Sequence, residues 1–137
     1  MSSFRIFDIA GSGMSAQSVR LNTVASNLAN AESVSGNPQT VYRAKHPVFQ
    51  AMLGNAADAA GARVGVAGIT ESQATPESRY DPGNPLADSQ GYVYAPAVNV
   101  VEEMTDMISA SRSYQNNVEV LSTARDLMLA TLKLGQG

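Results

Sequence analysis

The stretch LNTVASNLANA, residues 21–31, decides the fold that we expect of this chain. Its apolar residues recur at alternating steps of three and four, which keeps them on one side of an α-helix. The pattern reaches back to Phe7, and a second pattern with the same spacing runs from Met104 to Leu132. Helices at opposite ends of a short chain can pack together only if the chain folds back on itself.

The two patterns predict which side chains meet when the helices pack. The N-terminal stripe consists of Phe7, Ala10, Met14, Gln17, Leu21, Val24, Leu28 and Ala31. The C-terminal stripe consists of Met104, Met107, Ser111, Tyr114, Val118, Leu121, Arg125, Met128 and Leu132. We expect an antiparallel, coiled-coil-like hairpin in which the central residues of the N-terminal stripe lie near the central residues of the C-terminal stripe. The first central group is Leu21, Val24 and Leu28, and the second is Val118, Leu121 and Met128.

The chain divides into three parts, and the expected fold class is α+β. Residues 1–38 carry the N-terminal helix, expected over 3–32 and ended by the turn residues of SVSGNP. Residues 39–96 form a small middle domain that is β-rich or irregular. Residues 97–137 carry the C-terminal helix, whose first turns hold acidic residues that complement the helix dipole.

Within the middle domain, alternating apolar residues predict three strands. They lie at residues 41–45, 63–69 and 91–95. For residues 47–53 the sequence leaves two alternatives open, an extension of the first strand or a short turn. The small and polar residues 54–62 predict a flexible loop tip, and the turn residues of 75–85 predict an extended loop.

The N-terminal helix is unusually poor in charge. Between Asp8 and Glu32 the only charged residue is Arg20. A helix with one solvent-exposed face normally carries Lys and Glu on that face. Small uncharged residues on all faces of a helix instead allow it to pack on several sides. An ordinary bundle helix with a bland surface remains possible, but we favour contacts on several sides within an oligomer. The candidate packing and assembly residues are Phe7, Met14, Leu21, Val24, Asn27, Leu28, Asn30, Met104, Met107, Tyr114, Val118, Leu121, Met128 and Leu132.

Composition disfavours several classes of function. The formal charge of −3 and the lack of any Lys/Arg run argue against nucleic acid as a partner. The chain has no Cys and a single His, His46, so we expect no metal site and no cofactor. Glu102 and Glu103 are adjacent on a helix and point about 100° apart, so they do not converge on a substrate. We therefore do not expect an enzyme.

No segment has the pattern of a membrane span or of a cleavable signal peptide. The N-terminal helix is interrupted by polar residues and falls short of the ~20 consecutive apolar residues that a span needs. Residues 1–30 lack a basic segment followed by a compact apolar one. By the standard secretion route, such a chain would stay in the cytoplasm.

Residues 22–31, NTVASNLANA, resemble the N-terminal signature of the flagellar rod, hook and hook-associated axial proteins. The second half of the chain is similar to the short proximal-rod members of that family. The matching residues are 81–82, 87–88, 91–93, 96, 98–99, 101–104, 106–108, 113–121 and 124–132, and Ala97 departs from the family pattern.

The resemblance implies a structural subunit of the proximal rod of the bacterial flagellar basal body. Such subunits polymerise helically and transmit motor torque to the hook. The implied partners are other copies of the chain, other proximal and distal rod proteins, and the export apparatus in transit. The rod spans the periplasm, and type III export explains how its subunits reach it without a cleavable signal peptide. A soluble helical adaptor or export chaperone, which also pairs amphipathic helices, is the alternative.

Overall fold

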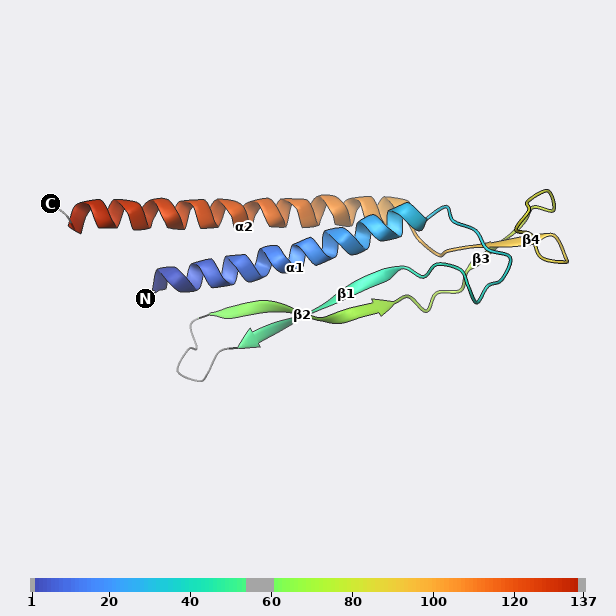
Figure 1. The fold of residues 1–137 in the computed structure, drawn as a ribbon, viewed down its shortest axis with the longest axis horizontal. Coiled ribbons are helices and arrows are strands. Elements are labelled where there is room, and N and C mark those ends of the chain that lie inside the picture. The colour runs from blue at the N-terminus through green and yellow to red at the C-terminus, as the bar shows by residue number, and fades with distance from the viewer. Residues whose placement is uncertain (1, 54–60, 136–137) are drawn as a thin grey trace.

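The computed structural model describes residues 2–53 and 61–135 (Figure 1). The elements in chain order are α1 (Ser2–Asn30), β1 (Lys45–Leu53), β2 (Ala62–Glu71), β3 (Glu77–Tyr80), β4 (Tyr92–Ala95) and α2 (Val100–Gly135). The two long helices and two small antiparallel sheets confirm the expected α+β class. The predicted loop tip at 54–62 falls mostly outside the described residues.

The helices are antiparallel, as predicted, and α1 is the middle layer of the molecule. Figure 1 shows α2 along one side of α1 and the hairpin of β1 and β2 along the other, with both termini at the same end. The small sheet of β3 and β4 lies beyond the opposite end of the helix pair. Because α1 has a neighbour on two sides, its residues must satisfy two different interfaces.

The beginning of α2 is defined by a side-chain cap. The Oδ1 atom of Asn99 accepts hydrogen bonds from the backbone N–H groups of Val101 and Glu102, at 3.1 and 3.3 Å. An Asn at this position satisfies N–H groups that have no partner within the helix. Glu102 and Glu103 follow in the first turn, where carboxylates complement the positive end of the helix dipole.

The strands differ in part from the sequence prediction. Residues 63–69 lie inside β2 and residues 92–95 form β4, which confirms two expected strands. The bounds 41–45 expected for the first strand are wrong, because β1 begins only at Lys45. The extension of this strand over residues 47–53 is confirmed, because β1 pairs with β2 through Leu53, opposite Ala62. The strand β3 lies within 75–85, a region expected to be loop, and its register is set by pairing with β4. Pairing with a partner strand thus outweighs local turn propensity.

A backbone bridge joins the chain after α1 to the chain before α2. The N–H of Ser35 donates to the carbonyl of Tyr94 at 2.9 Å, and the N–H of Tyr94 donates to the carbonyl of Ser35 at 2.8 Å. Val93, next to this bridge, is completely buried. The bridge therefore closes the hairpin at the end where α1 stops and α2 begins.

Asn27 links α1, α2 and β1 through a single buried side chain. Its Nδ2 donates to the carbonyl oxygen of Lys45 at 2.9 Å and to Oε2 of Glu103 at 3.1 Å. Its Oδ1 accepts from the N–H of Lys45 at 2.8 Å and from the hydroxyl of Tyr42 at 2.9 Å. Asn27 is 0% exposed, and its amide uses both donors and both acceptor sites. The peptide of Lys45 is thus paired much as it would be with a neighbouring strand.

The network around Asn27 extends along α1. Because the hydroxyl of Tyr42 donates to Asn27, the hydroxyl of Ser26 serves as the donor in its 3.0 Å contact with Tyr42. Asn30 donates to the carbonyl of Ser26 at 2.8 Å, in the last turn of α1. These bonds hold the end of α1 against the segment that leads into β1, so the hairpin is docked where the strand starts.

Asp88 organises the turn between β3 and β4. Its Oδ1 accepts from the N–H groups of Tyr92 and Gln90, both at 2.9 Å, and its Oδ2 accepts from the hydroxyl of Tyr94 at 3.2 Å. The bond from Tyr92 is the main cause that lowers the pKa of Asp88 below its ordinary value of 3.8. Desolvation, and then the bond to Asp88, raise the pKa of Tyr94. Asp88 therefore stabilises the turn between β3 and β4, as the turn residues around it in the sequence predict.

Replacing Asn27 by Ala should lower the free energy of unfolding by roughly 2–4 kcal/mol, because Glu103, Tyr42 and the Lys45 peptide lose buried partners. Urea unfolding followed by circular dichroism measures the change. Asn22→Ala is the matched control, because Asn22 lies on the exposed side of the same helix. Equal unfolding midpoints for the two variants would contradict the role of Asn27.

The stabilising effect of Asp88 should depend on pH. Its pKa is lower in the folded protein than in the unfolded chain, so its contribution is present above about pH 3.8 and is lost as the pH falls through the folded-state pKa. The difference in stability between the wild type and Asp88→Ala should therefore shrink below about pH 3.8. A difference that stays constant between pH 7 and pH 2 would contradict this prediction.

Candidate assembly interface

The interface between the helices is built from layers that recur every seven residues. On α1 the positions facing α2 are Ile6, Gly13, Arg20 and Asn27. On α2 they are, in the same order, Ala124, Asn117, Ala110 and Glu103, of which Ala124, Ala110 and Glu103 are buried. Each step of seven along α1 is met by a step of seven backwards along α2, as in an antiparallel coiled coil.

Large and small residues meet within these layers. A Cβ atom at Gly13 would lie 3.0 Å from the side-chain nitrogen of Asn117, so a glycine is needed where Asn117 crosses α1. Ile6 lies beside Ala124, and the fully buried Ala110 falls in the layer of Arg20. Small residues therefore let the two backbones approach at three of the four layers.

Arg20, the one charged residue in the middle of α1, is used inside the molecule. Its guanidinium donates to Oδ1 of Asp106 on α2 at 2.8 Å. Together with the bond from Asn27 to Glu103, this ion pair aligns the two helices in one register. No charge from α1 between Asp8 and Glu32 is therefore left for the outer surface.

The residues predicted to face α1 from α2 differ in their exposure. Met107, Leu121 and Met128 are partly buried as expected, but the alternating positions are shifted by one residue. The predicted Met104 and Val118 are 53% and 45% exposed, while their neighbours Glu103 and Asn117 face α1. An apolar pattern cannot identify an interface in which every second layer on α2 is small or polar.

The predicted pairing between the central groups of the two stripes is wrong. Arg20 binds Asp106, and Asp106 lies about 18 Å along α2 from Val118 at 1.5 Å per residue. Leu21 and Leu28 therefore lie near the beginning of α2, and Val118 lies near the first half of α1. The heptad pattern is compatible with several registers that differ by seven residues. Hydrogen bonds and ion pairs between the helices determine which of these registers forms.

The candidate assembly residues fall into three groups by exposure. Two of them, Val24 and Asn27, are buried. The partly buried residues are Phe7, Met14, Leu21, Leu28, Asn30, Met107, Leu121 and Met128. The exposed residues are Met104, Tyr114, Val118 and Leu132. The exposed group belongs entirely to α2, so among these candidates the uncovered side chains lie on that helix.

The outward surface of α2 carries a row of heptad positions, which we call the α2 stripe. Its large apolar members are separated by Ser111, Gln115, Ser122 and Arg125. Its large members lie at heptad spacing and are between 45% and 73% exposed. They are Val101, Met104, Ile108, Val118, Leu129 and Leu132. Single exposed apolar residues are normal on a protein surface, but a regular stripe of them marks an interaction site.

The outward surface of α1 is uncharged and small, and we call it the α1 stripe. Its members also lie at heptad spacing and are exposed. They are Ser15, Ser18, Asn22, Ala25 and Ala29. A groove of about 360 Å³ runs beside it, where Val19 and Asn22 face Ile69 of β2. A solvated helix face seldom lacks charge over such a length, so this surface fits a packed environment.

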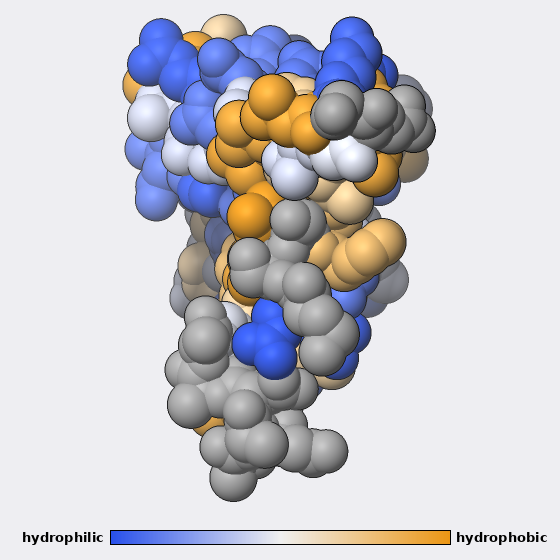
Figure 2. Space-filling view, turned by 90° about the vertical axis from the view of Figure 1, so that its left-hand side faces the viewer, coloured by the Kyte–Doolittle hydropathy of each residue, from blue (hydrophilic) through white to orange (hydrophobic). Residues whose placement is uncertain are grey.

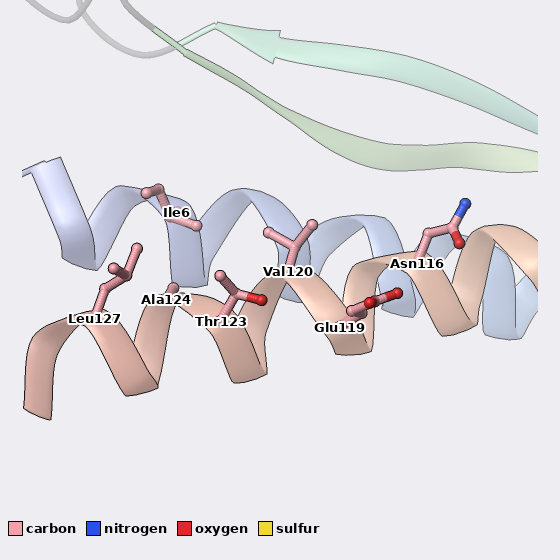
Figure 3. A pocket seen from close by; sticks show the side chains of 7 residues that line it. All are labelled: Ile6, Asn116, Glu119, Val120, Thr123, Ala124 and Leu127. Carbon is pink, nitrogen blue, oxygen red and sulfur yellow. The ribbon is translucent and has the colours of Figure 1, made fainter. Parts of the chain in front are cut away.

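The helices also leave an apolar groove between them near the termini. Its volume is about 430 Å³, and Ile6 of α1 and Val120, Ala124 and Leu127 of α2 form its apolar walls (Figure 3). Figure 2, a view from the end with the termini, shows apolar side chains running from α2 toward α1. At this end the interior of the helix pair is thus open to a neighbour.

The described residues bear on the expectations for a metal site and a membrane span. Among residues 2–53 and 61–135, no group of three or more His, Asp or Glu is placed to hold a metal ion. His46 is exposed on β1, beside the groove that holds the bonded pair of Arg20 and Asp106. In the same ranges, neither helix is long and apolar enough to cross a membrane.

Two family models match the chain, and together they include most of both helices. The model described as "Flagella basal body rod protein" matches residues 7–36. The model described as "Flagellar basal body rod FlgEFG protein C-terminal" matches residues 89–134. The matched ranges include Asn27 and Glu103, which bond to each other across the interface.

Similar proteins match over nearly the full length. The flagellar basal-body rod protein FlgC of Escherichia coli O6:H1 is 57% identical over 136 residues, covering 99% of this chain and 100% of that protein. The protein of the same name from Salmonella typhimurium is 56% identical over the same shares. That of Agrobacterium fabrum is 42% identical over 92% of this chain and 90% of its own length.

Two glycines of α1 should respond in opposite ways to substitution. Gly11→Ala should raise the free energy of unfolding by roughly 0.5–1 kcal/mol, because a Cβ there has nothing within 4 Å and glycine weakens a helix. Gly13→Leu should lower it by roughly 1–3 kcal/mol, because the side chain must displace Asn117. Urea unfolding measures both changes, and a stabilised Gly13→Leu variant would contradict the close approach.

Proposed function

Because the chain belongs to the FlgC family of flagellar basal-body rod proteins, it is a structural subunit of the rod, and we propose that it builds the proximal rod by helical stacking. The observation that supports stacking is the pair of unsatisfied helix surfaces. The α2 stripe is exposed and apolar, and the α1 stripe is exposed and uncharged. Neighbouring subunits would cover both surfaces.

The helix pair is the part that we assign to the rod axis. We propose that residues 1–38 and 97–137 form the axial domain and that residues 39–96 form a middle domain attached to it. The candidate assembly residues then act in two ways. Val24 and Asn27 hold the helices of one subunit together, while Met104, Val118 and Leu132 contact neighbours.

We further propose that the subunit lies in the part of the basal body that spans the periplasm. It would reach this place through the flagellar export apparatus, without a cleavable signal peptide. Its partners would be copies of itself and other proximal and distal rod proteins, and the rod would transmit torque from motor to hook. Long helices depend on packing for most of their stability, which suits a subunit that finishes folding as it joins the rod.

The alternative of a soluble adaptor or export chaperone has less support. Such a protein also pairs amphipathic helices, but the similar proteins are rod proteins along their whole length. An enzymatic role has no family support either, because the matched models describe rod proteins.

Adding a charge to the α2 stripe should abolish assembly without unfolding the subunit. A strain that lacks its own gene for this chain should swim when it receives the wild-type gene. It should not swim with Met104→Glu, because an unpaired charge in a packed interface costs several kcal/mol. Swimming in soft agar and electron microscopy of isolated basal bodies measure the outcome.

Ser109→Glu is the matched control, because it adds the same charge to an exposed position of the same helix outside the stripe. Circular dichroism of the purified variants checks that both remain helical. Normal swimming with Met104→Glu would refute the role of the α2 stripe. Failure of the wild-type gene to restore complete rods would refute the rod function itself.

A further inference from the structure

The two exposed stripes of the helix pair are complementary in size. The α2 stripe presents large apolar side chains, and the α1 stripe presents Ser, Asn and Ala at the same heptad spacing. Large side chains on one helix pack closely against small ones on another, because the small ones let the backbones approach. The groove beside the α1 stripe, with the 52% exposed Ile69 on its wall, gives these side chains further space.

The stripes face in different directions, so one chain cannot bring them together. At 100° per residue, Ala25 lies about 160° around α1 from Asn27, which faces α2. Ile108 lies about 160° around α2 from Ala110, which is buried against α1. The two surfaces therefore point away from each other, and each needs a partner from outside the chain.

An antiparallel register matches residues 104–118 of the α2 stripe with residues 15–29 of the α1 stripe. Beyond this part it sets Leu129 opposite Phe4 and Val101 opposite Glu32. When Ala25 is set opposite Ile108, Ala29 falls opposite Met104. Ser15 then falls opposite Val118, because the steps of three and four coincide on the two helices. Every large apolar member of this part of the α2 stripe thus meets Ala or Ser on the other helix.

The same register places opposite charges together at its end. It sets Asp8, which lies seven residues before Ser15 of the α1 stripe, opposite Arg125, which occupies a heptad position of the α2 stripe. Within the part of the chain that the structure describes, Arg125 forms an ion pair with its sequence neighbour Asp126 at 3.2 Å, and its side chain is 68% exposed. An exposed pair contributes little to affinity, but opposite charges select one register over its alternatives.

We propose that the α2 stripe of one subunit packs on the α1 stripe of a second copy of this chain, antiparallel and with Ile108 opposite Ala25. This inference rests on the proposed rod function. The register within the subunit and the register between subunits differ by three residues, so neighbouring copies are offset by about 4.5 Å along the helices. Since each copy offers one stripe of each kind on different sides, the contact is head-to-tail and continues to further copies.

Cysteine cross-linking tests the register directly, because the natural chain has no Cys. Two single variants, Ala25→Cys and Ile108→Cys, carry different epitope tags and are produced together in a strain without the wild-type gene. After mild oxidation, non-reducing electrophoresis should show a covalent dimer that carries both tags. Because each copy has one Cys, the bond can form only between copies. Ala29→Cys with Met104→Cys forms a second pair.

Ala25→Cys with Ser109→Cys is the control, because Ser109 is exposed but turned about 100° away from Ile108. It should give no dimer. Swimming cells in which neither stripe pair cross-links would overturn the proposed contact and leave the rod function intact. A copy contact that uses other surfaces, or another rod protein on the α2 stripe, would give this result. Failure of the wild-type gene to restore swimming would instead overturn the rod function.

Exchange of the end charges provides a second test that needs no oxidation. Asp8→Arg and Arg125→Asp should each reduce swimming, because like charges then meet at the end of the register. The double variant should recover swimming, because the pair is restored with its signs reversed. A double variant that swims no better than either single variant would contradict the register.

Discussion

The structure depends on one buried amide, because Asn27 is where its three layers are tied together. Through this side chain, α1 bonds to Glu103 of α2 and to both backbone groups of Lys45 at the start of β1. All of its hydrogen-bonding capacity is used, so any displacement of α2 or of the hairpin leaves a buried polar group without a partner. An aliphatic residue here would pack, but it would not distinguish one register of the helices from another.

The nature of the contacts between α1 and α2 explains why much apolar surface of α2 remains exposed. Among the described residues, the contacts between the helices include the small residues Gly13 and Ala110, the ion pair of Arg20 and the amide of Asn27. Many large apolar residues of α2 are therefore not buried inside the subunit and remain on its surface. A stable monomer would place them in its core, whereas a rod subunit gains by holding them for its neighbours.

Sequence patterns located the helices, two of the strands and the uncharged character of α1. They misplaced half of the α2 interface, because Glu103, Ala110 and Asn117 carry no apolar signal at the layers where they face α1. They missed β3, because the segment is rich in turn residues and its strand character comes from pairing with β4. Asn27 was recognised as a packing residue, but nothing in the sequence indicated that its partners are Lys45, Tyr42 and Glu103.

The sequence by itself determined that two amphipathic helices close a hairpin, because heptad spacing is a local property of each helix. It also determined that α1 carries almost no charge, and through its close similarity to rod proteins it determined the family. Tertiary structure decided the register, because a pattern that repeats every seven residues fits several registers equally well. Only the hydrogen bonds of Asn27 and the ion pair of Arg20 select one of them, and that selection leaves one face of each helix for a neighbour.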